Sequence, residues 1–223
     1  AWLRSQLRTS HGIDLKLPNL NNGPDSSTIS PKTAIDAINA LYEGDAATKP
    51  EGGEKKKIHL VGSSLGGYVA ALYASRYPDR VKSLILICPS FDMENRWWNG
   101  TWGKGFMDTW RKDGARDFRG PRNVTVRVPY RFVEDFCVVP AFPRVTCPTI
   151  ILHGRHDEVV PVGASERFVE EMQKNTNEHG TSTDATVLQI IDDDHAMTKP
   201  ETLELLLKIV ERHWNLPPQD ADQ

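Results

Sequence analysis

One segment of the sequence, residues 58–77, constrains the fold more than any other. It begins with an apolar run, continues as Gly62-Ser63-Ser64-Leu65-Gly66, and is then rich in alanine until Pro78. This order predicts a buried strand, a sharp turn and a helix that the proline ends. In that context the Gly-x-Ser-x-Gly pattern holds a serine hydroxyl out at a strained turn, and the two glycines leave room because they lack a Cβ. Ser64 is therefore a candidate nucleophile.

The same small residues could belong to a turn that only packs, or to one that binds a phosphate. A Walker-type phosphate loop needs a lysine followed by serine or threonine after its second glycine. Here Gly66 is followed by Gly67 and Tyr68, which disfavours a phosphate loop. A helix that begins near Leu65 would instead direct its positive end toward a reacting carbonyl.

Composition limits the class of protein. A chain of 223 residues predicts one domain with a large core. The net charge is −3 and the basic residues are dispersed, so nucleic acid is not an expected partner. An odd number of cysteines, three, favours a reducing compartment over a disulfide framework. We find no signal peptide and no apolar run of the roughly 18 residues that a membrane span needs.

Short apolar runs alternate with longer amphipathic segments along most of the chain. Strands are expected over 13–17, 58–61, 81–88, 149–153 and 186–191, and helices over 1–10, 31–42, 65–77, 161–174 and 201–213. Polar connections are expected over 19–30, 44–57 and 175–185. This alternation is typical of an α/β fold, a mostly parallel sheet with helices on both faces.

Residues 91–146 interrupt the alternation. This segment is rich in tryptophan, phenylalanine and arginine and lies between two predicted core strands, so we interpret it as a lid inserted into a single domain of residues 1–223. Trp97, Trp98 and Trp102 are candidate contacts for an apolar substrate, because aromatic rings bury large areas. That they form the core of the segment itself is an equally open alternative.

A serine nucleophile needs a base, and the base needs a group that orients it. Asp157 and His195 each follow a predicted strand, where the functional groups of open α/β sheets gather. Asp92, after an earlier strand, is the alternative acid. The stretch His-Gly-x-x-Asp-x-x-Val-Pro around Asp157 favours that residue.

These motifs resemble those of the α/β-hydrolase family, in particular its compact, lidded serine esterases, lipases and thioesterases. The resemblance covers residues 58–213 apart from the lid, and the order Ser64, Asp157, His195 is the order of that family. It implies that Ser64 is the nucleophile, His195 the general base and then acid, and Asp157 the orienting carboxylate. It also implies that the backbone N–H of Leu65 donates to the oxyanion.

Several neighbouring residues have plainer interpretations. His153 is expected to be packed at the end of its strand, and His156 to point away from Asp157. The run Asp192-Asp193-Asp194 is expected to be a solvated turn, with one member aiding the histidine loop. No group of histidine, cysteine and carboxylate residues has metal-ligand spacing, so we expect no metal and no cofactor.

The chain departs from the family pattern at its beginning. In the family, a strand before the one expected at 13–17 ends in a His-Gly type loop that supplies a second oxyanion N–H. Nothing upstream of Ala1 supplies that loop here. We therefore expect the sequence to be a fragment or processed form that lacks this N-terminal strand and its oxyanion loop.

The expected function is that of a serine hydrolase, with a small-molecule carboxylic ester or thioester as substrate and an acyl-serine intermediate. The same three residues would also serve a hydrolase of carbon–carbon or amide bonds. A protein of this fold that binds a ligand or partner without catalysis is the third possibility. The sequence does not indicate an oligomeric state.

Overall fold

A four-stranded parallel sheet forms the centre of the molecule. The computed structural model describes residues 2–20, 29–45, 56–119, 124–179 and 186–217. The sheet has the order β1-β2-β5-β6, with β1 at Ile58–Ser63, β2 at Val81–Ile87, β5 at Thr149–Gly154 and β6 at Thr186–Ile191. All three strand pairs are parallel, which confirms the predicted α/β architecture.

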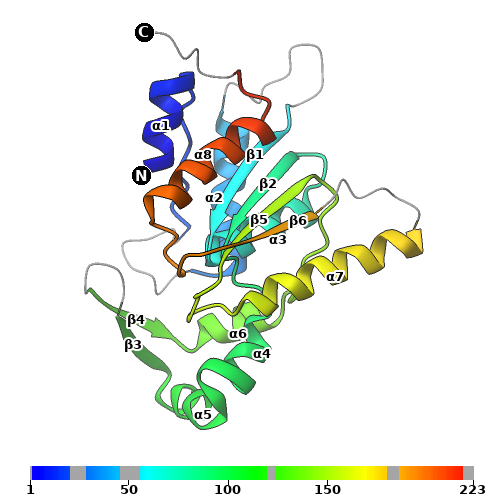
Figure 1. Cartoon of the computed structure of the whole chain (residues 1–223). Coiled ribbons are helices and arrows are strands. Elements are labelled where there is room, and N and C mark those ends of the chain that lie inside the picture. Colours follow the sequence, from blue (N-terminus) through cyan, green and yellow to red (C-terminus); the bar gives the residue numbers. More distant parts are fainter. Residues whose placement is uncertain (1, 21–28, 46–55, 120–123, 180–185, 218–223) are drawn as a thin grey trace.

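Helices cover both faces of this sheet (Figure 1). One layer holds α1 (Trp2–His11) and α8 (Pro200–His213), and the other holds α2 (Pro31–Gly44), α3 (Leu65–Arg76) and α7 (Val162–His179). Successive strand residues point to opposite faces, so Ile85 joins the apolar cluster of α1 and α8 while Leu84 and Leu86 join the larger cluster of the other layer. Two apolar cores, one on each face, thus hold the sheet.

The segment between β2 and β5 leaves the sheet, as predicted. It contains α4 (Met93–Arg96), a π-helical turn η3 (Trp97–Thr101), α5 (Gly103–Asp113), an antiparallel pair β3 (Ala115–Arg119) and β4 (Thr125–Pro129), and α6 (Arg131–Cys137). Figure 1 shows these elements together at one end of the molecule, opposite α1 and the C-terminus. The small hairpin β3–β4 was not predicted.

The strand predicted over 13–17 is wrong: these residues have no regular secondary structure. In the described part of the chain they have no strand partner, and the sheet neighbour of β1 is β2 alone. Their alternation has another cause. Ile13 and Leu15 pack against the cluster of α1 and α8, while the Asp14 carboxylate turns outward and accepts hydrogen bonds from Arg4 at 3.0 and 2.8 Å.

Several other boundaries differ from the prediction, and those of α7 and β1 are examples. Helix α7 continues to His179 and takes up half of the connection expected over 175–185, because polar side chains alone do not end a helix. Strand β1 extends two residues further than predicted, to Ser63. The expected connections over 19–30, 44–57 and 175–185 lie in part outside the described residues. Among those described, we find no helix whose length and hydropathy would suit a membrane span.

Candidate active site

Ser64 lies at the tip of the turn between β1 and α3. Its backbone angles are φ 54° and ψ −122°, a conformation that non-glycine residues rarely adopt. A Cβ on Gly62 would lie 2.3 Å from the carbonyl oxygen of Gly66, so the turn can close only with glycine at position 62. A Cβ on Gly66 would have no atom within 4 Å. The predicted need for a small residue therefore holds for the first glycine of the pattern and not for the second.

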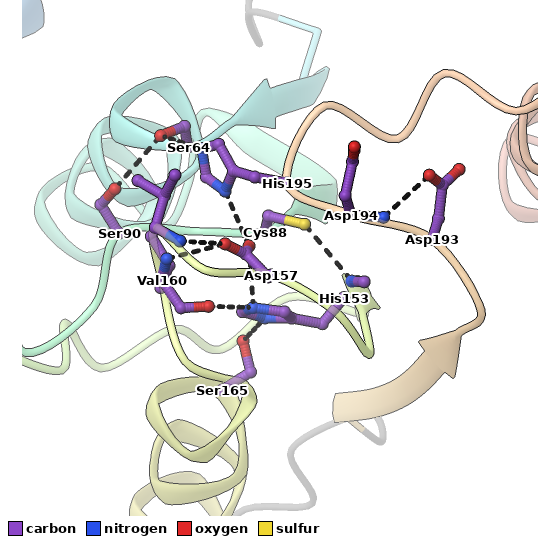
Figure 2. Close-up of polar contacts among 12 residues, drawn as sticks. Ser64, Cys88, Ser90, His153, Asp157, Val160, Ser165, Asp193, Asp194 and His195 are labelled. Atoms are coloured by element: carbon purple, nitrogen blue, oxygen red, sulfur yellow. Dashed lines mark hydrogen bonds and ion pairs between the residues drawn. The ribbon is translucent and has the colours of Figure 1, made fainter.

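Ser64, His195 and Asp157 form one chain of hydrogen bonds (Figure 2). The Nε2 atom of His195 lies 3.0 Å from the Oγ atom of Ser64, and its Nδ1 atom lies 2.7 Å from Oδ2 of Asp157. An ionised carboxylate only accepts hydrogen bonds, so Nδ1 of His195 donates and Nε2 is left to accept from the serine hydroxyl. The three residues come from the loops after β1, β5 and β6, which meet at the carboxyl edge of the sheet.

The Asp157 carboxylate is buried and fully partnered. Oδ1 accepts hydrogen bonds from the backbone N–H groups of Val159 at 2.8 Å and Val160 at 2.7 Å, and Oδ2 lies against His195 and, at 3.3 Å, His153. Burial by itself would raise the pKa of Asp157. The hydrogen bonds from His153, His195 and the two amides outweigh burial and hold that pKa well below its usual range. The carboxylate is therefore ionised at neutral pH.

Asp92, the alternative acid, is engaged elsewhere. Its Oδ2 atom pairs with the Arg167 guanidinium at 2.7 Å and accepts a hydrogen bond from Asn95 at 2.9 Å. The structure thus brings Asp157, and not Asp92, to the histidine.

The loops that hold Asp157 and His195 are tied to each other through their backbones. The N–H of Arg155 donates to the carbonyl of Ile191 at 2.7 Å, and the N–H of His156 donates to the carbonyl of Asp193 at 3.0 Å. A Cβ on Gly154 would lie 2.4 Å from the carbonyl oxygen of Asp194, so glycine permits this close approach. These contacts fix the separation of the imidazole and the carboxylate.

The acidic run before His195 was predicted to be a solvated turn, and this is wrong for Asp193. Asp192 is exposed and pairs with His156 at 2.7 Å, so His156 does point away from Asp157. Asp193 is buried, with 2% of its surface exposed. Its carboxylate accepts hydrogen bonds from the N–H groups of Asp194 at 2.8 Å and Lys199 at 3.1 Å and so braces the loop that presents His195.

Sequence reasoning missed two contacts of the site. His153 is completely buried, as expected of a packed strand end, but it also touches the Asp157 carboxylate. Its ring nitrogens contact the Ser165 hydroxyl and the Val160 carbonyl, both at 2.8 Å. Its spacing four residues before Asp157 was the available signal. The Ser90 hydroxyl lies 3.3 Å from the Ser64 hydroxyl, and the sequence contained no pattern that would have identified it.

Among the described residues, one group has the composition of a metal site. Donor atoms of Cys88, His153 and Asp157 lie within 4.8 Å of one another. Burial raises the pKa of the Cys88 thiol to about 12, which disfavours the thiolate that a metal would bind. Both ring nitrogens of His153 already contact oxygen atoms. Hydrogen bonding within the protein thus accounts for all three side chains.

The candidate aromatic contacts pack mainly on each other. The rings of Trp97 and Trp102 stack with centroids 5.8 Å apart, and Trp102 also lies 5.4 Å from Phe106. Trp98 is half-buried, and the Arg111 guanidinium lies 5.1 Å from its ring centroid. The stacking of Trp97 and Trp102 favours the interpretation that these two form the core of their own segment.

Comparisons with known proteins show which proteins this chain is similar to. The chain is 31% identical over 110 residues to monoacylglycerol lipase abhd6-B of Xenopus laevis, and the match spans 48% of this chain and 30% of that protein. It is 27% identical over 164 residues to the mitochondrial palmitoyl-protein thioesterase ABHD10 of Mus musculus, spanning 66% and 48%. The matches thus span less than half the length of these curated relatives.

Solved structures show the same fold. Mouse α/β-hydrolase domain-containing protein 10 superposes with a TM-score of 0.65 at 20% identity, covering 83% of this chain and 70% of that one. The monoacylglycerol lipase of Paleococcus ferrophilus superposes with a TM-score of 0.66 at 17% identity, covering 97% and 88%. The family model for the α/β-hydrolase fold matches residues 23–134, half of the chain. The chain belongs to the α/β-hydrolase fold family.

Proposed function

We propose that the protein is a serine hydrolase that cleaves a carboxylic ester or thioester through an acyl-serine intermediate. One observation carries the proposal: the unbroken chain of hydrogen bonds from the Ser64 hydroxyl through His195 to the buried Asp157 carboxylate. A serine hydroxyl attacks a carbonyl only when a base removes its proton, and this arrangement supplies that base.

The first half of the reaction forms the acyl-enzyme. As Ser64 Oγ bonds to the substrate carbonyl carbon, its proton passes to Nε2 of His195, and the ionised Asp157 stabilises the resulting imidazolium through Nδ1. The tetrahedral intermediate carries a negative oxygen. Leu65 is the first residue of α3, so its N–H has no partner within the helix and is available to that oxygen.

The second half restores the enzyme. The imidazolium returns its proton to the alcohol or thiol as the bond from carbon to oxygen or sulfur breaks. His195 then takes a proton from the water molecule that attacks the acyl-serine carbonyl carbon. It returns that proton to Ser64 Oγ as the bond between Oγ and the acyl carbon breaks, which releases the carboxylic acid and free Ser64. Atoms and charges balance without a cofactor.

The class of substrate rests on two further arguments. The relatives are named a monoacylglycerol lipase and a palmitoyl-protein thioesterase, and both names denote hydrolysis at an acyl carbon. The aromatic segment between β2 and β5 would supply apolar surface for the acyl group. Of the three candidate tryptophans, Trp98 is the one whose ring does not stack on another aromatic ring among the described residues. We keep Trp97 and Trp102 as weaker candidates.

Turnover of matched substrates tests the proposal. We expect hydrolysis of p-nitrophenyl octanoate and of an octanoyl thioester, and we expect Ser64→Ala to lower turnover by at least about 10³-fold. Ser63→Ala is the matched control, because Ser63 is the exposed neighbour in the same turn and has no place in the hydrogen-bond chain. Equal turnover by wild type and Ser64→Ala would refute the proposal, and a preference for amide or diketone substrates would change the bond assigned.

A further inference from the structure

A second cavity lies far from Ser64, at the amino-terminal edge of the sheet. Its volume is about 640 Å³, and its lining comes from the starts of β1, β2 and β5 and from the end of α8. We call it the basal pocket and define it by Lys57, His59, Lys82, Ser83, Arg212 and His213. His59 precedes Ser64 by five residues along β1 and the turn that follows, a separation of roughly 16 Å in an extended chain. The basal pocket is therefore separate from the catalytic edge.

The charge of this pocket has one sign. Lys57, Lys82 and Arg212 line it, and no aspartate or glutamate does. Within the described part of the chain, none of these three cations pairs with a carboxylate. The whole chain has a net charge of −3, so a wholly basic cavity is not a consequence of composition. Converging cations without counter-charges favour an anionic ligand.

The two histidines of the pocket are affected by this environment. The His59 ring contacts the Ser83 hydroxyl at 2.6 Å through Nδ1. Burial, and then the nearby charges of Lys82 and His213, lower the pKa of His59 to about 4. His213 Nε2 is buried and has no hydrogen-bond partner among the described residues. A buried polar atom without a partner is uncommon, and because this one is buried it would stay out of direct contact with a ligand in the cavity.

Most of the remaining lining is apolar, and its polar members are Thr146, Gln189 and Asn215. Val81, Ile150 and Ile209 contribute side chains to the cavity, together with Pro78 and Pro148. A bare inorganic ion would leave this surface without contacts, whereas an anion with a short hydrocarbon body would bury it.

We propose that the basal pocket binds a small organic anion, with its charged head against Lys82, Arg212 and Lys57 and its hydrocarbon body against Ile150 and Ile209. The proposal does not depend on the catalytic role of Ser64. It assigns the protein a second ligand site, at the edge of the sheet opposite Ser64, His195 and Asp157.

Histidine ring resonances in the NMR spectrum of the full chain test this directly. Octanoate serves as the probe, inorganic phosphate as the head alone and 1-octanol as the body alone. We expect octanoate to shift the ring signals of His59 and His213 in a saturable way, with apparent affinity that falls as salt is added. Phosphate and octanol should bind at least about tenfold more weakly, because each makes only part of the contacts. His195 reports separately on any octanoate at the catalytic site.

A pair of variants completes the test. Lys82→Gln combined with Arg212→Gln should weaken octanoate binding at His59 by at least about tenfold. Lys208→Gln, an exposed cation on the same helix α8 that does not line the pocket, should leave binding unchanged. The unperturbed His195 signal shows that each variant is folded. Shifts confined to His195, or equal binding by the double variant, would overturn the proposal, and phosphate binding as tight as octanoate would overturn its apolar part.

Discussion

At the scale of single residues, the site depends on a carboxylate that stays ionised while buried. Asp157 achieves this with two backbone amides on one oxygen and two imidazoles against the other. Each hydrogen bond favours the charged form, and together they exceed the cost of burial. The low pKa of Asp157 is thus a property of its partners and not of exposure to solvent.

Replacing the Asp157 carboxylate by an amide of nearly the same shape should reveal what its charge contributes to catalysis. In Asp157→Asn the amide oxygen can still accept from the Val159 and Val160 N–H groups, but its NH₂ group cannot accept from His195. The imidazole would then lose its orientation and its counter-charge, so we expect kcat to fall by about 10⁴-fold. Circular dichroism should show a folded protein. A loss of less than tenfold in kcat would contradict the role we assign to Asp157.

At this scale the sequence indicated which residues are candidates for the site, but it did not indicate all of their contacts. Ser64, Asp157 and His195 were recognisable because each stands in a motif at the end of a strand. The contact of His153 with the carboxylate, four residues away, was not, because it depends on how the loop after β5 folds back on its own strand. The burial of Asp193 was not, because it depends on how two loops far apart in the sequence approach each other. The Ser90 hydroxyl reaches Ser64 across the β1–β2 boundary for the same reason.

At the scale of elements, the strand–turn–helix around Ser64 permits a matched pair of variants. Gly62→Ala places a methyl group 2.3 Å from backbone that cannot move aside, and we expect it to lower the free energy of unfolding by about 3 kcal/mol or more. Gly66→Ala meets no atom within 4 Å and adds a better helix former near the start of α3, so its effect should stay within about 1 kcal/mol.

Urea unfolding of both variants measures these changes. The two substitutions are chemically identical and four residues apart, so a general sensitivity of the turn to alanine would affect both equally. Equal destabilisation would show that the close approach to Gly62 is not the reason for its glycine.

Elements with strong local signals were predictable, and those defined by distant partners were not. The four strands of the sheet and the helices that follow them have apolar periodicity with proline or glycine at their ends. Residues 13–17 have the alternation of a strand, yet in the described structure Ile13 and Leu15 pack against the apolar cluster of α1 and α8 and pair with no strand. Alternation of apolar and polar residues indicates which side chains are buried, and packing against helices can bury them as well as a place in a sheet can.

At the scale of the whole molecule, the two edges of the sheet hold charged groups of different kinds. The carboxyl edge holds a buried anion, and the amino edge holds uncompensated cations around His59. This second edge predicts a dependence of global stability on pH. The pKa of His59 is about 4 in the folded protein and about 6.5 when unperturbed, so between these values the unfolded chain binds more protons. The stability that the neutral, buried His59 contributes is therefore fully present above pH 6.5 and is lost as the pH falls toward 4.

Unfolding measured at pH 7 and at pH 5 would check this dependence. His59→Gln retains a polar side chain but removes the titrating group, so the loss of stability between these two pH values should be smaller than in the wild type. Because His59 is half-buried, solvent screening reduces the size of the effect without changing its sign. An identical loss in the variant would place the titration at another group.

The central claim is that Ser64 is a nucleophile activated by His195 and Asp157. The most direct measurement is covalent labelling of the full chain with a fluorophosphonate, followed by mass spectrometry of the peptides. We predict a single modified peptide that contains Ser64, with labelling abolished in Ser64→Ala, greatly slowed in His195→Ala and retained in Ser63→Ala. No labelling of the wild type, or labelling that persists in Ser64→Ala, would contradict the account.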